Sequence, residues 1–295
     1  MATEVSGFPS FSFGSTVSDI FGVIGRNFLL LSGLALLLYG VPSALFTIYL
    51  MNSVMSLASG SAFSGSGNPL DIFSMLGTGF VLGIIGSIFI SIYTQGAMIW
   101  SALHDLDGGK PTFGGALSAG LRFFLPILAI TIMFYVAIAA IATLPALLVF
   151  GIGVISIAVL LFIFIIIPLL VFATVLLMWA VPAAINERIG PIEAISRSVY
   201  LSSGNRWKLV AMLVIYLLTA VIISSTISGV AMPFTMAGDL DPASPFDGLM
   251  PIMAIQSLLN SLILVLGYPA IAATYHNLRI SKEGESPEGV ADIFE

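Results

Sequence analysis

Two histidines lie beside acidic or amide residues, and these side chains are the best suited to acid–base or metal chemistry. His104 is followed by Asp105 and Asp107, and His276 is followed by Asn277. A histidine near a carboxylate can act as a general base or help to hold a metal ion. No His-Glu-x-x-His spacing, P-loop, dinucleotide fingerprint or nucleophile elbow lies in usable context. We therefore expect solvated helix ends here and no catalytic residue, metal or cofactor, with an enzyme acting through His104, Asp105 and His276 as the alternative.

A second set of residues could bind anionic groups. Arginines at three places lie beside aromatic or amide residues, directly before long apolar runs. If those runs cross a membrane, the basic groups lie at the level of the lipid phosphates, where each is attracted by about 1 kcal/mol. The candidate lipid-headgroup contacts are Arg26, Arg122, Arg206, Trp207 and Lys208. The alternative is that these side chains only anchor the ends of the helices.

Three amides, Gln95, Gln256 and Asn260, stand within the apolar runs. Gln256 and Asn260 are four residues apart and therefore share one face of a helix. They could line a polar groove, or they could hydrogen bond between helices at about 0.6 kcal/mol per contact. We favour helix packing and keep all three as candidate intramembrane polar contacts.

The whole chain is too apolar for a soluble fold. Of its 295 residues, 58% are hydrophobic and 8% are charged, whereas soluble domains have about 25% charged residues. The mean hydropathy is +1.11, and such a surface could not be wetted. The net charge of −6 excludes the basic footprint of a nucleic-acid-binding protein, and the absence of cysteine excludes disulfides and thiolate metal sites. The chain is predicted to be an integral membrane protein.

Uncharged runs predict six membrane spans, because a bilayer core of about 30 Å needs about 20 apolar residues in a helix. Four spans are expected near residues 28–50, 77–100, 209–232 and 252–275. The run 123–186 would be about 96 Å long as one helix, so it must fold back into two. The turn is expected near Pro145 or residues 151–153.

The basic residues predict the orientation of these spans. All nine Lys and Arg fall before span 1, between spans 2 and 3, between spans 4 and 5, or after span 6. The positive-inside rule makes that side cytoplasmic. Both termini are therefore expected in the cytoplasm. No Asp, Glu, Lys or Arg lies inside a predicted span, which counts against a proton relay through buried carboxylates.

Three cytoplasmic segments, 16–25, 112–121 and 191–203, carry apolar residues at helical spacing. We expect each to lie as an amphipathic helix in the headgroup plane. A pseudo-repeat of three two-span units is one interpretation, and a general preference for arginine at membrane entries is the other. The predicted organisation is a cytoplasmic tail with an interfacial helix (1–27), a six-span domain (28–280) and an acidic tail (281–295).

The third of these segments has the clearest expected boundaries. Gly190 precedes Pro191, which suits the first position of a helix, and Glu193 suits its N-terminal turn. Gly204 suits the C-terminal cap. The segment is predicted to be a short helix that ends just before Arg206.

Short motifs along nearly the whole chain resemble a known family. They are GPIEAI (190–195), RS (197–198), GNRW (204–207), YTQGA (93–97), LR (278–279) and KEG (282–284). They resemble the glycerophosphodiester phosphodiesterase membrane-domain family of bacterial multi-span proteins. The resemblance implies a six-helix fold in the bacterial inner membrane. It implies no phosphodiesterase activity, because the chain has no His-Arg-Gly motif and no clustered carboxylates for a metal.

The sequence therefore predicts an all-α polytopic membrane bundle with six transmembrane and three interfacial helices. The favoured role is non-enzymatic handling or transport of a lipid or another amphipathic molecule. The alternative is a structural or assembly subunit that packs against another membrane protein or a second copy. The expected partners are the bilayer itself and anionic lipid.

Overall fold

A computed structural model describes residues 11–59, 69–152, 164, 167–237 and 250–284. Every secondary-structure element within these ranges is a helix, which confirms the all-α prediction there. Five helices are long and apolar enough to cross a membrane. A sixth span results if Phe113–Arg122 and Phe124–Ala140, which are bent by 56°, are counted as one. The apolar helices thus indicate a membrane-spanning protein.

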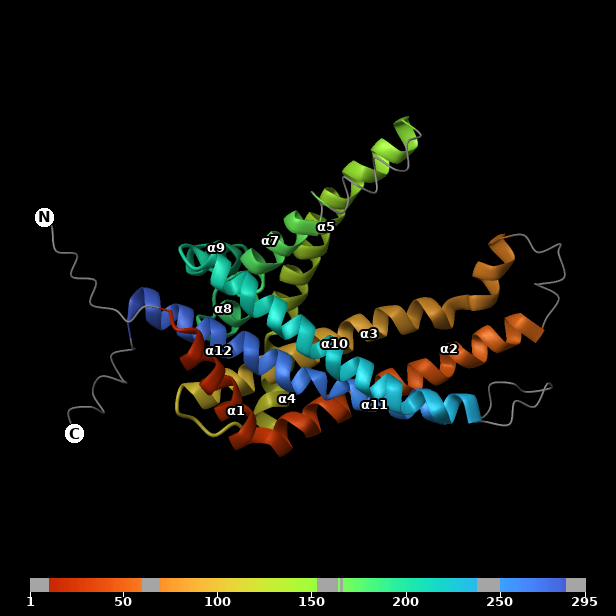
Figure 1. The fold of residues 1–295 in the computed structure, drawn as a ribbon, viewed down its shortest axis with the longest axis horizontal. Coiled ribbons are helices and arrows are strands. Elements are labelled where there is room, and N and C mark those ends of the chain that lie inside the picture. Colours follow the sequence, from red (N-terminus) through yellow and green to blue (C-terminus); the bar gives the residue numbers. More distant parts are fainter. Residues whose placement is uncertain (1–10, 60–68, 153–163, 165–166, 238–249, 285–295) are drawn as a thin grey trace, which may run out of the picture.

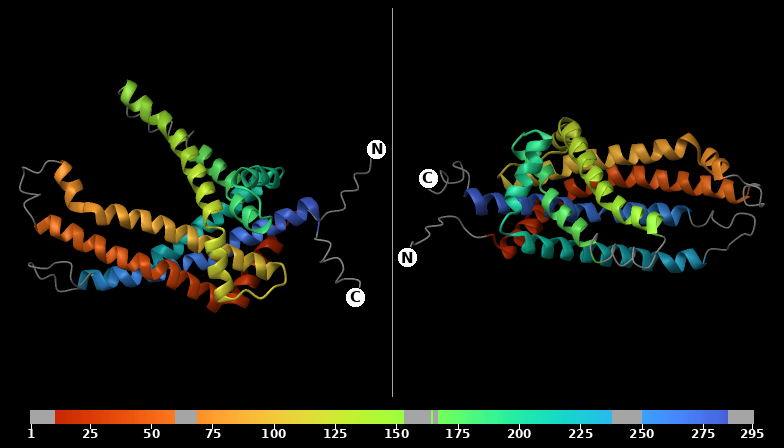
Figure 2. Two further views of the ribbon diagram at one scale, coloured as in Figure 1. Left: turned by 180° about the vertical axis from the view of Figure 1, so that it is seen from behind. Right: turned by 90° about the horizontal axis from the view of Figure 1, so that it is seen from above.

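Long helices leave a common packed end and then diverge. The elements are α1 (Phe13–Leu34), the π-helix η1 (Ala35–Gly40), α2 (Val41–Ser59), α3 (Pro69–Leu106), α4 (Phe113–Arg122), α5 (Phe124–Ile152), α7 (Ile167–Leu177), α8 (Ala180–Asn186), α9 (Pro191–Ser202), α10 (Arg206–Ala237), α11 (Met250–Ser261) and α12 (Ile263–Glu283). Helices α2, α3, α10 and α11 run side by side, whereas α5 and α7 form a separate arm (Figure 1, Figure 2).

Each of the three segments expected to be amphipathic is helical and ends at a backbone break beside an arginine. In α1, Asn27 leaves helical geometry with φ −122° and ψ 21°, directly after Arg26. Helix α4 ends at Phe123, with φ −93° and ψ 4°. Helix α9 begins at Pro191, as predicted, and is followed by Gly204 with φ +80°. The local pattern recurs three times, and a repeat of the whole two-span unit stays a prediction.

Helix α5 continues through Pro145 to Ile152. The turn expected near Pro145 or residues 151–153 therefore does not occur at Pro145, and residues 153–163 lie outside the described part. Proline removes one backbone hydrogen bond, a loss that membrane helices tolerate. By contrast, the π-helix η1 stands just before Pro42, whose missing N–H cannot bond to the preceding turn. Wider turns of this kind occur often at functional sites.

The buried core lies at one end of the molecule, where α1 begins and α12 ends (Figure 1). Helix α3 is central to it, in contact with α1, α4, α8 and α12. Small side chains let these helices approach closely, as is common in membrane proteins; they include Ala97, Ala102, Ala116, Ala180, Ala183, Ala184, Ala194 and Ala272. The far halves of the helices are much less covered, and only 6% of the most apolar window of α10 is buried.

Candidate functional site

All nine lysines and arginines gather at the packed end, where α3, α8 and α12 end and α1, α4, α9 and α10 begin (Figure 1). We call this the basic end. Its charged side chains fall into two groups. Some form ion pairs that hold helix ends together, and others line a cavity or are exposed on the surface.

Arg26 belongs to the first group. It binds the Asp105 carboxylate through two nitrogens, with Nη2 at 2.6 Å and Nε at 3.1 Å from Oδ2. Asn27, at the break in α1, donates to the other oxygen of Asp105 at 2.7 Å. The Asp105 side chain is only 7% exposed, so its charge depends on these donors. The contact holds the end of α3 against the bend in α1.

Glu187 forms a second junction, just after α8. Its Oε1 accepts from Arg197 Nε at 2.8 Å and from the Tyr275 hydroxyl at 2.6 Å. Arg197 also donates to Glu283 at 2.7 Å, near the end of α12. The hydrogen bond to Glu283 and the second one to Glu187 outweigh desolvation and raise the Arg197 pKa above its ordinary value. α8, α9 and α12 are thereby joined around one arginine.

Helix α12 thus extends past the predicted end of the membrane domain at residue 280. Glu283, inside the predicted acidic tail, is its last residue. Nearby, Asn277 donates to Asp19 at 2.7 Å and accepts from Ser15 at 3.2 Å. These bonds fix the end of α12 to the first turns of α1.

The other predicted headgroup contacts are scattered over the basic end. Arg206 lies over the Phe172 ring, with 5.4 Å from Cζ to the ring centre. Trp207 is 85% exposed. Lys208 donates to the Phe11 carbonyl at 3.1 Å. Arg26, Arg206 and Lys208 therefore have separate protein partners.

Arg122 has a different environment. It lines a cavity of about 510 Å³ between α3, the α4–α5 bend and α8, which we call the arginine pocket. Its polar lining side chains are His104, Asp107, Ser118, Arg122, Asn186 and Arg188. Neither Arg122 nor Arg188 forms a hydrogen bond or ion pair with any residue that the structure describes. Arg122 Cζ lies 5.6 Å from the centre of the Phe123 ring. The pocket therefore presents two guanidinium groups that have no acidic partner among the described residues.

Close packing of α4 on α3 builds one wall of this pocket. Thr112 caps α4 by accepting from the Gly115 N–H at 3.2 Å. A Cβ at Gly115 would come within 2.8 Å of the Trp100 ring, so only glycine permits this approach. Tyr93 donates to the Leu117 carbonyl at 2.9 Å and fixes the other side of α4. Arg122, the last residue of α4, is thereby brought beside α3.

Among the histidines and acids considered for catalysis, His104 and Asp107 line the arginine pocket, whereas Asp105 is engaged elsewhere. Asp105 is bound by Arg26 and Asn27, whereas His104 stacks on Trp100 with 4.9 Å between ring centres. His276 Nδ1 lies 3.8 Å from Asp107 Oδ1. In the described ranges, no group of three or more His, Cys, Asp or Glu side chains is placed to hold a metal ion.

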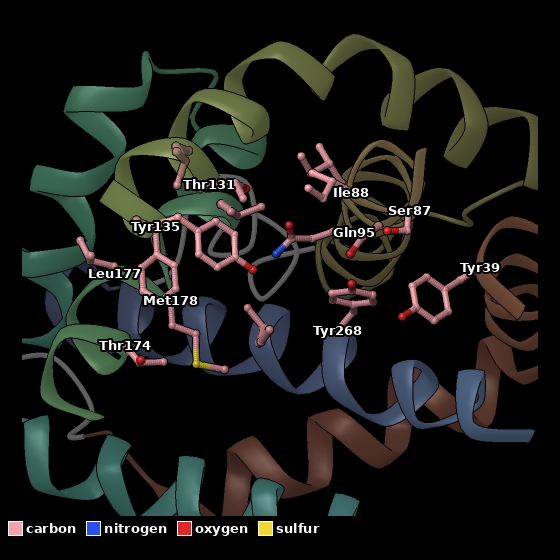
Figure 3. Close-up of a pocket in the computed structure, with 16 residues that line it drawn as sticks. Tyr39, Ser87, Ile88, Gln95, Thr131, Tyr135, Thr174, Leu177, Met178 and Tyr268 are labelled. Carbon is pink, nitrogen blue, oxygen red and sulfur yellow. The ribbon is translucent and has the colours of Figure 1, made fainter. Parts of the chain in front are cut away.

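A second cavity, of about 460 Å³, lies deeper among the apolar helices (Figure 3). It is enclosed by η1, α3, α5, α7, α12 and the start of α8, and we call it the inner cavity. Its lining is apolar apart from eight side chains, which are Tyr39, Ser87, Ser91, Gln95, Thr131, Tyr135, Thr174 and Tyr268. Its size lies in the range of about 300–1,000 Å³ that is usual for ligand sites.

Gln95 is the predicted amide that faces this cavity. In Figure 3 its side chain extends from α3 into the enclosed space, toward Tyr135 on α5. Ile88 and Tyr135 line the same cavity and are 44% and 61% exposed. The inner cavity is therefore open sideways, between α3 and α5, to whatever surrounds the helices.

Gln256 and Asn260 do not line the inner cavity or the arginine pocket. Gln256 donates to Ser228 on α10 at 2.7 Å, which is a contact between helices. Asn260 donates back to the Gln256 carbonyl at 3.0 Å. The geometry agrees with the helix-packing interpretation of Gln256, whereas the Asn260 bond lies within α11.

Arg188, Tyr39 and Tyr268 line the two cavities but are not distinguished by any sequence pattern. Arg188 is one of several basic residues between spans 4 and 5, and the tyrosines stand on helices far apart in sequence. Tyr39 and Ser87 also line a third cavity of about 480 Å³ between α2, α3 and α11. Tyr39 lies on the π-helical turn η1, a feature that often marks functional sites but is visible only in the structure.

Comparison with protein-family models, with curated proteins and with solved structures found no match for this chain. The resemblance to the glycerophosphodiester phosphodiesterase membrane-domain family therefore stays a prediction that rests on its short motifs.

Proposed function

We propose that this protein binds an amphipathic lipid, and that the inner cavity takes the apolar chain of that lipid. The carrying observation is the cavity itself, which is about 460 Å³ in volume and bordered by exposed Ile88 and Tyr135. Lipid chains surround a membrane helix bundle, so a cavity open sideways is accessible to them. A few hydroxyl and amide groups in an apolar lining are typical of sites that orient one ligand.

The position of the basic end supports a defined orientation for this ligand. Along α3, the arginine pocket follows the inner cavity after five residues, from Gln95 to Trp100, which is about 7.5 Å. A molecule with a polar head at the basic end and a chain in the inner cavity would span that distance. Handling of such a lipid, by transport or by presentation to another protein, is the role we infer.

The proposed setting is the bacterial inner membrane, with six spans and both termini in the cytoplasm. In this arrangement the α4–α5 pair counts as one bent span, and the first half of α1, α4 and α9 lie in the headgroup plane. Their bends beside Arg26, Arg122 and Arg206 support it. Because the chain has no cysteine, single substitutions test it. Ser64→Cys and Ser244→Cys should react with an impermeant thiol reagent from outside, and Lys110→Cys should react only after the membrane is opened.

Native mass spectrometry of the gently purified protein tests lipid binding. We expect the wild type to carry one retained lipid species at constant stoichiometry. Gln95→Trp places a large ring in the inner cavity and should abolish retention, whereas Ser225→Trp, on the outer side of α10, should not. Thr131→Phe, which fills the cavity from α5, repeats the test if Gln95→Trp does not fold.

Two results would contradict the proposal. One is an unchanged amount of retained lipid in folded Gln95→Trp and Thr131→Phe. The other is a wild type that retains a protein partner at constant stoichiometry with only heterogeneous lipid. That second result would support the alternative role as an assembly subunit.

A further inference from the structure

We propose that the arginine pocket is a binding site for a phosphate-type anion, held by Arg122 and Arg188. This rests on the proposed function in one respect, since a lipid headgroup is the favoured source of the anion. The pocket itself is defined by residues that the inner cavity does not share.

The charges in the pocket suit an anion. Arg122 and Arg188 contribute two positive charges without an ion-pair partner among the described residues. Asp107 contributes one negative charge and lies 3.8 Å from His276 Nδ1. The balance is one net positive charge, which matches a phosphodiester. Guanidinium groups bind phosphate oxygens through paired hydrogen bonds, so two of them can hold such a group in a defined orientation.

The backbone at Arg188 gives independent support. Arg188 has φ +54° and follows Glu187, the C-cap of α8, at a position where helices usually place glycine. A residue with a side chain is disfavoured in this left-handed conformation. Glycine would make the turn with less strain, so the turn does not explain the arginine. Its place in the pocket does.

Other arginines of the basic end show that the pocket is distinct. Arg26 and Arg197 are bound to carboxylates, at 2.6 Å from Asp105 and 2.8 Å from Glu187. Arg206 and Arg122 each lie over an aromatic ring, at 5.4 Å from Phe172 and 5.6 Å from Phe123, but Arg206 lines none of the cavities described above. Arg206 is therefore a matched control with the same charge, the same end of the molecule and no pocket.

The polar groups beside the arginines point to the kind of head. Ser118 and Asn186 add a hydroxyl and an amide to the lining, which can bond to the hydroxyls of a glycerol-type head. A phosphatidylglycerol head and a free phosphate ester offer the same chemistry. The adjacent inner cavity favours the lipid.

The test is a binding titration of the full-length protein in neutral detergent, followed by native mass spectrometry. The probes are phosphatidylglycerol, phosphatidylcholine and inorganic phosphate. We expect phosphatidylglycerol to bind at least tenfold more tightly than phosphatidylcholine. Arg122→Gln and Arg188→Gly should each weaken phosphatidylglycerol binding about tenfold, the loss expected for one charge-assisted hydrogen bond. Arg206→Gln should leave it unchanged.

Equal losses in Arg122→Gln and Arg206→Gln would overturn the site, because they would indicate general surface attraction. Wild-type affinity in Arg188→Gly would also overturn it. Binding of inorganic phosphate that depends on Arg122 and Arg188, without preference between the two lipids, would support the anion site and assign it to a soluble phosphate ester.

Gln95→Trp separates this inference from the proposed function. If Gln95→Trp binds phosphatidylglycerol as the wild type does, the chain-binding role of the inner cavity fails while the anion site stands. If Gln95→Trp loses the lipid but keeps phosphate binding, both proposals are supported.

Discussion

Arg26 and Arg122 each stand directly before a backbone break, close to an aromatic residue and at the same end of the molecule, yet they have different surroundings. Arg26 holds the nearly buried carboxylate of Asp105 and is itself 59% exposed. Arg122 faces a cavity of about 510 Å³ with Arg188 in the same lining. The same local sequence pattern thus places one arginine in a structural ion pair and another in a candidate binding site.

The partners explain this difference. The end of α3 supplies two carboxylates, of which Asp105 is bound by α1 and Asp107 lies near His276 on α12. Neither carboxylate forms an ion pair with the arginines of the pocket among the described contacts. The end of α8 contributes Glu187, but Arg197 and Tyr275 already occupy it. Arg122 and Arg188 are thus left without an acidic partner by the way the helix ends pair.

The largest effect on stability is expected at the ion pair between Arg26 and Asp105. Arg26→Ala leaves the nearly buried Asp105 carboxylate with Asn27 as its remaining described partner, so the free energy of unfolding should fall by about 2–3 kcal/mol. Asp105→Asn leaves Arg26 free to be solvated and should lower it by only about 1 kcal/mol. Thermal unfolding in one detergent measures both. Equal losses, or a larger loss in Asp105→Asn, would contradict the comparison.

Glu187 should rank next. Glu187→Ala removes the acceptor of both Arg197 and the buried Tyr275 hydroxyl, and we expect a loss of about 2 kcal/mol. Tyr275→Phe removes one of the two bonds and should lower stability by about 1 kcal/mol. The same melting experiment checks the order, and a harmless Glu187→Ala would show that the junction is not structural.

Arg188 should respond in the opposite direction. Arg188→Gly relieves the left-handed backbone strain, so the free energy of unfolding should rise by about 0.5–1 kcal/mol. The melting temperature should rise with it. Arg188→Ala keeps a Cβ at φ +54° and is the control that should show no gain. A loss of stability in Arg188→Gly would mean that the side chain supports the fold rather than a ligand.

The smallest effects are expected at the exposed anchor. Arg206→Gln and Trp207→Ala each remove a side chain without a described hydrogen bond or ion pair, and the stability should change by no more than about 0.5 kcal/mol. In Arg206→Gln, fluorescence quenching of Trp207 by brominated lipid in vesicles should still report a position at the headgroup level. A large destabilisation by either substitution would mean that Arg206 or Trp207 holds helix ends together, as Arg26 does.

The features that depend on local sequence were predictable. Long uncharged runs require helices, and five long apolar helices are present, with the bent α4–α5 pair as a sixth candidate. Gly190, Pro191 and Gly204 mark the beginning and end of α9 because their backbone preferences act within one turn. Proline signals were weaker, since α5 continues through Pro145.

The features that depend on which helices meet were not predictable from one sequence. Tyr39, Gln95 and Tyr268 come together only because η1, α3 and α12 converge around the inner cavity. Arg188 gained its importance from a backbone conformation and from a cavity shared with Arg122. The sequence pattern made Arg26, Arg122 and Arg206 the same kind of candidate headgroup contact, whereas their partners in three dimensions differ.

The central claim is that a lipid chain occupies the inner cavity, and cross-linking tests it most directly. A lipid with a photoactivatable group in its chain would be added to the protein in vesicles, irradiated, and mapped by peptide mass spectrometry. We expect adducts on Thr131–Tyr135 and Thr174–Met178 that disappear in Gln95→Trp, while labelling of Val221 and Ile222 on exposed α10 stays constant. Adducts on the cavity residues that are no more frequent than those on α10, or that persist in Gln95→Trp, would contradict it.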